Sequence, residues 1–538
     1  MGIDSEETYD IVIAGAGAAG CVLAYRLSAD PSLRIALVEG GPPDSHPYIH
    51  MPKGLGKMMS LTRYLWAFQT SPGPETQTAS ENWLRGRVLG GSTSVNGMMY
   101  VRGQPADFDE FARLAGDDWS WGHIGQAYAE LENHEFGPAP SRGGSGPFHV
   151  TVAKLRDRLS EMQVAAGVSM GLPLKEDVNI PDNGEGVGYA MRMIYRGKRE
   201  SAAVAFLKPV GRRPNLSVLT DTLVDKVVFD GKRAVGLAVL RGGKSSIIGA
   251  RREVILSAGT LSSPSILQRS GIGDPALLSR LNIPIVHANP AVGGNLAEHR
   301  AIMMQWRLKT ALSQNREYGG WRVVRNAARY YLFRSGPLAA AAYEVGLWLK
   351  SKPELSRPNI QFLVAPFSYD LTKFRAAMET APGMNLVTYP LRPSSRGRID
   401  INSSDPNEPP TINPNYRSTS VDCEELVAGL RLARRYVSQE PLRSVIDHET
   451  FPGPEYESDE QILEAYDKFG TCAYHAVGSC RMGSDPDSVV DPELRVRGVD
   501  GLRVIDASVM PEIPSGNTNG PTMAMAWRAA DILLRPGR

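Results

Sequence analysis

The chain has 538 residues, of which 42% are hydrophobic and 22% are charged, and this is the composition of a folded globular protein. The length exceeds what a single core of ordinary size supports, so we expect at least two domains. The net charge of +1 argues against a nucleic-acid-binding protein, because such proteins rely on basic surfaces that neutralise phosphates.

The cysteines and the first residues favour a cytoplasmic protein. Cys21, Cys423, Cys472 and Cys480 form neither a CxxC pair nor a cluster with histidine that would suit a metal. We therefore expect reduced thiols and no metal site. The acidic segment 1–7 lacks the regions of a signal peptide, and the apolar run after it is too short to cross a bilayer, so no integral membrane segment is expected.

The first predicted element is a β-α-β unit. Residues 9–14 form an apolar run typical of a buried parallel strand, and a second such run at 34–38 ends at Glu39. Between them lie a glycine-rich turn at 15–20, with the sequence GAGAAG, and an apolar periodicity that predicts a helix. An acid at the end of the second strand completes the pattern of a dinucleotide-binding unit.

Each glycine of this turn has a separate role. Gly15 permits the tight turn, Gly17 lets the backbone approach a pyrophosphate, and Gly20 lets the helix pack closely on the strand. The helix N-terminus presents free N–H groups to the phosphates, and the Glu39 carboxylate can accept hydrogen bonds from a ribose diol. The motif predicts a bound dinucleotide but does not distinguish FAD from NAD.

A run of small residues follows at 89–97, with the sequence LGGSTSVNG. It cannot be a regular helix or strand, and it would let the backbone lie against a flat ligand; a plain surface turn is the alternative. Short β-rich segments at 216–220, 224–229 and 253–259 then return the chain to a sheet, with a hairpin turn at 230–232.

Aromatic residues concentrate between about residues 300 and 470, which suits a pocket for an apolar or aromatic substrate. Those of interest are Trp306, Tyr318, Trp321, Tyr330, Tyr331, Phe333, Tyr343, Trp348, Phe362, Phe367 and Tyr369. Within this region, segment 321–334 interleaves basic and apolar residues. We interpret it as a solvated helix of the substrate domain, with a helix on a membrane surface as the alternative.

The end of the chain returns to an α/β pattern, with a strand at 501–506, a loop at 516–522 and a final helix. We therefore expect the last segment to complete the domain that the first residues begin. Two residues here could carry chemistry. His475 lies in a loop punctuated by small residues, and Asn517 lies just before the last helix. A neutral imidazole accepts a proton near pH 7 and an amide donates to an oxygen, but a lone histidine is more often structural.

Several segments together resemble the glucose–methanol–choline (GMC) oxidoreductase family of flavoproteins. Residues 85–96 are similar to the first signature of the family, and residues 259–273 are similar to the second. Residues 292–299 resemble its VGxNLxDH segment, with Glu298 in place of the usual aspartate. Residues 490–519 also follow the family pattern. The resemblance covers most of the chain.

The resemblance implies an α/β fold in which a Rossmann-like FAD-binding domain is interleaved with an α+β substrate domain built on an antiparallel sheet. The expected FAD-binding domain is discontinuous and comprises residues 1–155, 215–300 and 485–538. The expected substrate-binding domain comprises residues 156–214 and 301–484.

The resemblance also implies where FAD binds, with its pyrophosphate at the glycine-rich turn and its ribose at Glu39. The cofactor-binding residues that it implies are Gly15, Gly17, Ala18, Ala19, Gly20, Glu39, Gly40, Arg87, Gly91, Ser92, Asn96, Gly97, Val224, Ala258, Asp506, Ala507, Asn517 and Thr518. Val95 stands where choline-oxidising relatives can carry a histidine that tethers FAD, so we expect non-covalent FAD.

The implied catalytic residues are His475, which would accept the alcohol proton while hydride passes to flavin N5, and Asn517, which would orient the oxygen. The expected substrate is a primary alcohol with an apolar or aromatic group, oxidised to the aldehyde. A choline dehydrogenase-like activity is the alternative, because Glu344 resembles an acid near the choline site of relatives. A paired structural carboxylate is the other interpretation of Glu344.

Four further alternatives stay open at this point. The electron acceptor is oxygen, a quinone or a carrier protein, and peripheral contact with a membrane remains an option. A family member that does not oxidise alcohols, such as a hydroxynitrile lyase or a light-driven fatty-acid decarboxylase, would keep the same FAD signatures. An NAD-dependent dehydrogenase could use the same β-α-β unit.

Overall fold

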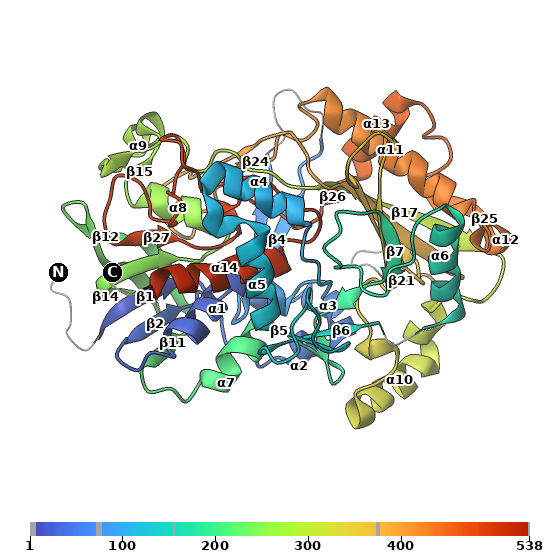
Figure 1. Cartoon of the computed structure of the whole chain (residues 1–538), viewed down its shortest axis with the longest axis horizontal. Helices are drawn as coiled ribbons and strands as arrows, with labels where there is room; N and C mark the ends of the chain where they lie inside the picture. The colour runs from blue at the N-terminus through green and yellow to red at the C-terminus, as the bar shows by residue number, and fades with distance from the viewer. Residues whose placement is uncertain (1–6, 72–77, 154–155, 373–376, 536–538) are drawn as a thin grey trace.

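The computed structural model describes residues 7–71, 78–153, 156–372 and 377–535, and two seven-stranded sheets organise this part of the chain (Figure 1). One sheet carries the first and last segments of the chain, and the other carries the middle. The acidic residues 1–6, on which the expectation of no signal peptide depends, lie outside the described ranges. Across those ranges, no helix is both long and apolar enough to span a membrane.

The first sheet has the order β11-β2-β1-β14-β13-β12, with β27 beside β14. Its parallel strands are β1 (Thr8–Ala14), β2 (Ile35–Val38), β11 (Leu216–Leu219), β14 (Lys244–Leu256) and β27 (Leu502–Val504). The antiparallel strands β12 (Thr222–Asp230) and β13 (Arg233–Arg241) form the predicted hairpin. Since β2 and the last four residues of β1 are apolar and fully buried, both strands lie inside the sheet and not at its edge.

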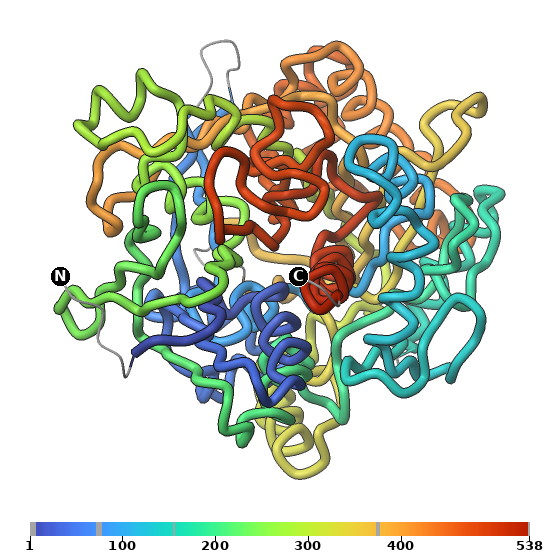
Figure 2. Tube along the Cα trace, turned by 60° about the vertical axis from the view of Figure 1, so that its left-hand side comes forward, coloured from blue at the N-terminus to red at the C-terminus, as the bar shows by residue number. Residues whose placement is uncertain are grey.

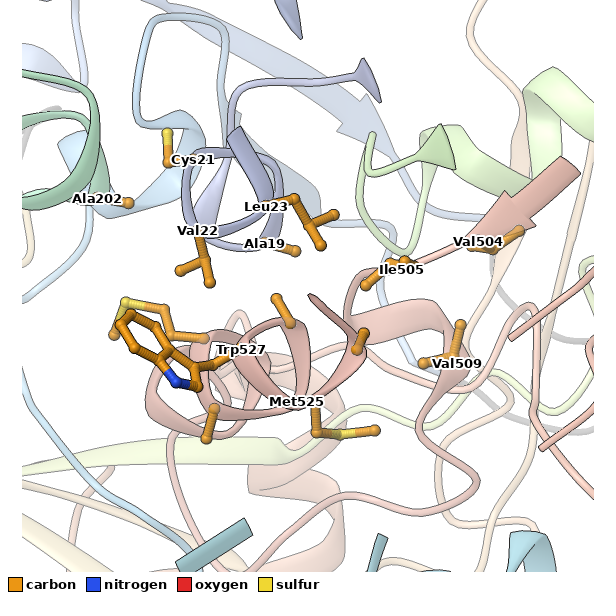
Figure 3. Packing of buried hydrophobic residues seen from close by; sticks show 14 of the residues in the cluster. Ala19, Cys21, Val22, Leu23, Ala202, Val504, Ile505, Val509, Met525 and Trp527 are labelled. Carbon is orange, nitrogen blue, oxygen red and sulfur yellow. The ribbon is translucent and has the colours of Figure 1, made fainter. Parts of the chain in front are cut away.

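Two helices from opposite ends of the chain pack together on this sheet. They are α1 (Ala18–Leu27) and α14 (Asn519–Leu533), and Val22 of α1 points towards α14 on the side where Trp527 lies (Figure 3). Figure 2 shows the same neighbourhood, with the last helix beside the first β-α-β unit. The end of the chain thus packs against its beginning, whereas its assignment to the first domain stays a prediction. The last helix begins at Asn519, so residues 519–522 of the predicted loop 516–522 belong to the helix.

The second sheet is antiparallel and has the order β25-β17-β22-β19-β18-β7, with β26 beside β17. Its strands are β7 (Gly186–Tyr189), β17 (Arg300–Leu308), β18 (Val345–Leu349), β19 (Ile360–Ala365), β22 (Gly383–Pro390), β25 (Ile446–Phe451) and β26 (Thr471–Cys472). The helices α6 (Arg158–Ser169), α11 (Ser420–Val437) and α13 (Asp459–Phe469) share its hydrophobic core. The predicted fold class is confirmed, whereas the domain boundaries stay a prediction.

Shorter elements connect and flank the two sheets. The remaining helices are α2 (Pro47–His50), α3 (Leu55–Met58), α4 (Pro105–Ala115), α5 (Trp121–Leu131), α7 (Lys208–Val210), α8 (Ser262–Arg269), α9 (Pro275–Arg280), α10 (Gly320–Phe333) and α12 (Leu442–Val445). The remaining strands include β3 (Leu65–Gln69), β4 (Asn82–Gly86), β5 (Glu132–His134), β6 (Phe148–Val152), β8 (Met191–Arg192), β9 (Ile194–Tyr195) and β10 (Lys198–Arg199). Helix α10 exposes much of its surface, Trp321 and Leu332 included, as expected of a solvated helix.

Candidate active site

A cavity of about 660 Å³ extends from the glycine-rich turn after β1 to the loop that holds His475. Its lining comes from both halves of the fold. The first sheet contributes the turn, Glu39 and the ends of β12 and β14, and the second contributes residues next to β18, β19 and β22. The cavity therefore joins the predicted nucleotide site to the predicted catalytic residues in one continuous space.

The glycine-rich turn has the geometry that a close phosphate contact requires. Gly15 has a φ of +101°, and a Cβ there would lie 2.4 Å from the Ser257 carbonyl oxygen. A Cβ on Gly20 would lie 1.9 Å from the Gly15 carbonyl oxygen, so Gly20 brings the helix onto the turn. At Gly17 a Cβ would meet no atom within 4 Å. Because Gly17 lines the cavity, this open face is available to a ligand.

Glu39 lies at the end of β2, as predicted, and its carboxylate lines the cavity. One oxygen accepts a hydrogen bond from the Ala16 N–H at 3.0 Å, and the other accepts one from the Gly41 N–H at 2.8 Å. Burial raises the pKa of Glu39 to about 7, against the effect of these two donors. The carboxylate thus ties the second strand to the glycine-rich turn next to the expected ribose position.

The cavity brings together most of the predicted site residues. In its lining are His475, Asn517, Gly15, Gly17, Ala18, Ala19, Glu39, Gly40, Gly91, Ser92, Asn96, Gly97, Val224, Ala258, Asp506, Ala507 and Thr518. Gly20 and Arg87 lie outside it. Gly20 faces the turn behind the cavity, and the Arg87 guanidinium lies over the Trp66 ring at 4.3 Å and donates to the Gly40 carbonyl. The expected roles of Gly20 and Arg87 in binding the cofactor stay predictions.

The small-residue segment 89–97 lies along the cavity rather than on the surface, and residues 91–94 form one 3₁₀ turn. A buried arginine that the sequence did not single out holds it. Arg199 donates to the side-chain oxygen of Asn96 at 2.8 Å and to the Thr93 carbonyl oxygen. Burial lowers the pKa of Arg199 to about 9. No local motif marks Arg199, because its partners lie about a hundred residues earlier in the chain.

Asp506 is also fixed by several donors. Its carboxylate accepts from the Gly259 N–H at 2.8 Å, from the Ser263 hydroxyl at 2.6 Å and from the Ser508 N–H at 2.8 Å. These donors stabilise the charged form, while burial raises the pKa of the carboxyl. The bonds join the second family-like segment to the last one, which explains why both patterns occur in one chain.

His475 and Asn517 meet at the far end of the cavity. The Nε2 atom of His475 lies 2.8 Å from Nδ2 of Asn517, and the Nδ1 atom of His475 lies 2.9 Å from Nδ1 of His299. Nε2 of His299 lies 2.8 Å from the carbonyl oxygen of Leu391. The two histidines and the asparagine therefore form one buried chain of hydrogen bonds that ends at a backbone carbonyl.

These hydrogen bonds determine which ring nitrogens of His299 and His475 carry a proton. Burial lowers the pKa of His299 to about 4, so this ring is neutral, and its single proton must lie on Nε2 because the Leu391 carbonyl can only accept. Nδ1 of His299 is then an acceptor, and His475 donates to it from Nδ1. Burial above all, and then electrostatic repulsion of a second positive charge by Arg85 and beside His299, holds the pKa of His475 well below its usual value. Nε2 of His475 consequently carries a lone pair, which receives the Asn517 amide N–H.

We predict that His299 acts as a positioning residue for His475. Replacing His299 by phenylalanine keeps a ring against Tyr389, where the two rings now stack at 4.7 Å, but removes the acceptor for Nδ1–H of His475. The rate constant of substrate-dependent flavin reduction should fall by about 10- to 100-fold, since the imidazole loses its fixed tautomer and orientation. Stopped-flow absorbance measures this rate.

The matched control for this substitution is Tyr389→Phe, which leaves the stacked ring and removes only the hydroxyl that donates to Gln361 at 3.0 Å. That variant should stay within about threefold of the wild type, because its change lies outside the histidine chain. Equal losses in the two variants would show that disturbed packing, and not proton placement, causes the effect.

Glu298 supports the histidine loop from behind. Its carboxylate accepts from the His475 backbone N–H at 2.8 and 2.9 Å and lies 3.6 Å from the Arg85 guanidinium. Burial raises the pKa of Glu298 to about 7, opposed by Arg85. Glutamate thus occupies the position of the usual aspartate of the family-like segment and binds the loop through its backbone. The sequence indicated the segment but not this contact.

The aromatic residues near the catalytic end differ from most of those expected. Of the predicted set, Tyr343 and Tyr369 line the cavity, and Tyr389 and Tyr474 join them. Trp306, Trp348 and Phe362 are instead buried in the hydrophobic cores, and Trp321, Tyr331 and Phe333 are exposed on α10. The predicted link between aromatic density and the pocket was therefore largely wrong, because density along the chain does not report which side of a strand or helix faces the cavity.

Glu344 lies next to Tyr343 but outside the cavity lining. It is 1% exposed, and both carboxylate oxygens are buried without a hydrogen-bond partner in the described part of the chain. Burial raises its pKa, and the nearest compensating charges are Arg192 and Lys53. The carboxylate therefore belongs to a buried charge cluster behind the site.

Comparison with known proteins places the chain in a family. The GMC oxidoreductase family models match residues 9–301 and 393–526. An alcohol dehydrogenase [acceptor] from Pseudomonas putida is 38% identical over 98% of this chain and 96% of its own length. An oxygen-dependent choline dehydrogenase from Serratia proteamaculans is 38% identical over 97% of this chain and 95% of its own. The structure of a formate oxidase from Aspergillus oryzae, solved to study FAD modification, has a TM-score of 0.90 at 26% identity and covers 98% of both chains.

The chain belongs to the GMC oxidoreductase family, whose members are FAD-dependent oxidoreductases acting on CH–OH groups. The residues of the cavity fit this cofactor. The open face of Gly17 leaves room for a pyrophosphate, Glu39 lies in the lining where a ribose is expected, and His475 lies at the opposite end. The family resemblance seen in the sequence is confirmed.

Proposed function

We propose that this protein oxidises a primary alcohol with an apolar or aromatic group to the aldehyde, with FAD as the cofactor. The observation that carries the proposal is the neutral His475, whose Nε2 lone pair lies beside the Asn517 amide at the end of the cavity. When the substrate binds, its hydroxyl replaces the Asn517 N–H as the donor to Nε2. Nε2 then accepts the hydroxyl proton, and the released amide donates to the oxygen as negative charge develops on it. Bound FAD supplies the acceptor for the hydride from the carbinol carbon.

The walls around the histidine support an uncharged substrate. Leu363 and Val387 line the cavity together with the rings of Tyr343 and Tyr369. Burial raises the pKa of Tyr369 to about 12, so its hydroxyl stays neutral. These walls favour an apolar or aromatic body. The charged lining residue that acts on His475 is Arg85, a cation paired with Glu298 at 3.6 Å, and it does not favour a cationic substrate.

Choline oxidation is the second candidate. Tyrosine ring faces can hold a quaternary ammonium group, and several relatives of the chain are choline dehydrogenases. The position of Glu344 outside the lining weakens this candidate, because the carboxylate does not face the space in which the ammonium would lie.

An anaerobic flavin-reduction screen tests the proposal. Benzyl alcohol, a linear aliphatic alcohol and choline are mixed with purified holoenzyme, and bleaching of the flavin absorbance is followed by stopped flow. Faster bleaching by benzyl or aliphatic alcohol supports the proposal, and faster bleaching by choline supports the second candidate. No bleaching by any alcohol, with cyanohydrin cleavage or light-dependent CO₂ release instead, overturns both. Colourless protein that reduces added NAD would indicate a nicotinamide enzyme.

We further propose that FAD is bound without a covalent tether. Val95 lines the cavity at the position of the tethering histidine of some relatives, and its side chain packs with Ile49, Met58 and Leu65. A valine side chain offers no nucleophile. Acid precipitation of the holoenzyme should therefore leave the yellow colour in the supernatant, and absorbance of the two fractions at the flavin band measures it. Colour that stays with the pellet contradicts the prediction.

The pH dependence of flavin reduction follows from the environment of His475. The pKa of this group is lowered below 6.5, first by burial and then by His299 and Arg85, so the base is already neutral at pH 7. Protonation of His475 removes activity only as the pH falls through the lowered pKa. We expect no loss attributable to His475 between pH 8 and 6.5, and an acid limb below that range that is absent in the His475→Ala variant. A limb centred at or above 6.5 that the variant lacks would contradict this.

The electron acceptor remains open between oxygen, a quinone and a carrier protein. Re-oxidation of the alcohol-reduced holoenzyme distinguishes the first two directly. Mixing with air-saturated buffer or with an anaerobic quinone analogue gives two rates, and the faster one identifies the class of acceptor.

A further inference from the structure

A second cavity of about 780 Å³ lies between the β6–β8 sheet, the β9–β10 hairpin and the C-terminal end of α10. Its volume is within the range of about 300–1,000 Å³ that is typical of small-molecule sites. Neither the proposed alcohol oxidation nor the expected FAD position uses it.

A buried arginine forms part of the wall of this second cavity. Arg192 on β8 is 5% exposed, and its Nε atom is buried without a hydrogen-bond partner. Burial lowers its pKa, and Glu344 and Glu135 are the acids whose charges act on it. No ion pair of Arg192 is found in the described part of the chain, and Glu344 is the acid whose charge acts on it most strongly. A buried guanidinium whose Nε lacks an acceptor is costly, and an anion that accepts from its other N–H groups would offset part of that cost.

The rim of the cavity adds three more arginines. Arg196 lies over the Tyr195 ring at 5.0 Å, Arg329 donates from Nε to the Ser335 hydroxyl at 3.2 Å, and Arg334 lies over the Tyr330 ring at 5.0 Å. The described lining residues thus include four arginines and a single carboxylate.

That carboxylate is Glu135, which accepts from the Val152 N–H at 3.0 Å. Four guanidinium groups and one carboxylate among the described lining residues give the lining an excess of positive charge, which Glu344 beside Arg192 offsets in part. Apolar side chains, among them Ile194 and Phe333, line the space between the charges. The lining therefore suits a molecule with one anionic end and a compact apolar body.

We propose that this second cavity binds a small organic anion, a carboxylate or a phosphate ester, with its charged oxygens on Arg192 and its apolar body between Ile194 and Phe333. Guanidinium groups match the planar or tetrahedral oxygens of such anions through paired N–H donors. Carboxylates and phosphate esters both present anionic oxygens to the arginine, and they differ in the geometry and charge of that group.

The second cavity is separate from the FAD cavity, because the segment 191–194, which joins β8 to β9, lies between them. Along residues 191–194 the side chains alternate in direction. Arg192 and Ile194 line the second cavity, whereas the Met193 sulfur accepts from Nδ2 of Asn519, which lines the FAD cavity. An anion in the second cavity should consequently bind in the presence of a saturating alcohol, since the two ligands occupy opposite sides of the strand.

Isothermal titration of the holoenzyme tests the proposal. Inorganic phosphate and benzoate are the probes, with chloride at matched ionic strength as the reference and bound FAD filling the phosphate site of the first cavity. We expect saturable 1:1 binding of at least one probe with a Kd below about 1 mM, unchanged by alcohol. Tighter binding of benzoate indicates a carboxylate ligand, and tighter binding of phosphate indicates a phosphate ester. Absence of binding by both probes below that limit overturns the proposal.

Variants locate the bound probe. Arg192→Met combined with Glu344→Gln removes both buried charges and should weaken binding by at least about tenfold, the effect of one charge-assisted contact. Arg212→Met, the same arginine-to-methionine exchange at an exposed position outside the cavity, should leave the Kd unchanged. Wild-type affinity in the double variant overturns the proposal.

If the double variant does not fold, the decision rests on Arg196→Ser at the exposed rim, which does not endanger the core. This substitution should weaken binding by about threefold, the usual effect of one exposed charge near a ligand. An unchanged Kd in Arg196→Ser, with probe binding insensitive to ionic strength, would likewise overturn the proposal.

Discussion

Replacing His475 by alanine is expected to lower the rate constant of alcohol-dependent flavin reduction by about 10³-fold, the usual contribution of a positioned general base. Its Nε2 lone pair is the acceptor for the hydroxyl proton, and the buried chain through His299 to the Leu391 carbonyl leaves no second imidazole facing the cavity in the described structure. Without it, water must take the proton in a space walled by apolar side chains. The loss should appear in the reduction step more than in substrate binding.

Stopped-flow reduction under anaerobic conditions measures this rate, and the flavin-to-protein ratio shows whether the variant still holds FAD. His448→Ala is the matched control, because His448 is an exposed histidine of β25 outside the cavity. The control should react at the wild-type rate. A His475→Ala variant that holds FAD and stays within about tenfold of the wild type would remove the assignment of His475 as the base.

Substituting Asn517 by alanine provides a useful comparison within the same prediction. The amide donates to the oxygen only as charge develops, so its loss should be smaller than that of the base. The hydrogen bond between Asn517 and Nε2 of His475 also means that the two substitutions are coupled, and their effects should not add.

The first β-α-β unit could be predicted in detail because its signals are local. The turn 15–20 needs glycine at Gly15 for its positive φ and at Gly20 for close packing, and both needs follow from neighbouring backbone. Apolar strands on either side and Glu39 at the end of β2 complete a unit in which each residue acts within about 25 positions of the others. Local consistency of this kind is readable without a structure.

The catalytic surroundings could be predicted only in part, because they depend on contacts between distant segments. His475 and Asn517 were found through family-like patterns, whereas the bond from His475 to His299 joins positions 176 residues apart. No spacing rule marks such a pair. Arg199 illustrates the same limit, since it donates to backbone carbonyls of the segment 89–97, more than a hundred residues earlier in the chain.

The aromatic residues failed as a guide for a different reason. The second sheet is antiparallel and covered by helices, so large apolar side chains on one face of its strands fill a core, and the same residue types on the other face line a cavity. Phe362 and Leu363 are neighbours in sequence, yet Phe362 belongs to the core and Leu363 lines the cavity. The packing of the two sheets decides which face of a strand points into the core and which lines the cavity.

Replacing Gly17 by valine is expected to abolish FAD retention and leave the apoprotein folded. A Cβ at Gly17 meets no protein atom within 4 Å, and φ of −82° suits any residue, so the fold gains no clash. The added side chain projects into the space next to the helix N-terminus, where a pyrophosphate must approach the backbone. The FAD dissociation constant should rise by at least about 100-fold, since both the backbone hydrogen bonds and the helix-end electrostatics are lost.

Two matched variants separate cofactor binding from folding in this prediction. Gly319→Val adds the same side chain to exposed extended backbone with open space around it, and should keep both FAD and stability. Gly20→Val places a Cβ 1.9 Å from the Gly15 carbonyl oxygen and should destabilise the apoprotein itself. Flavin absorbance after gel filtration and thermal unfolding of the apoproteins measure the two effects independently. If Gly17→Val retains FAD at the wild-type ratio, the pyrophosphate does not lie at this turn, and the cofactor site must be moved elsewhere in the cavity.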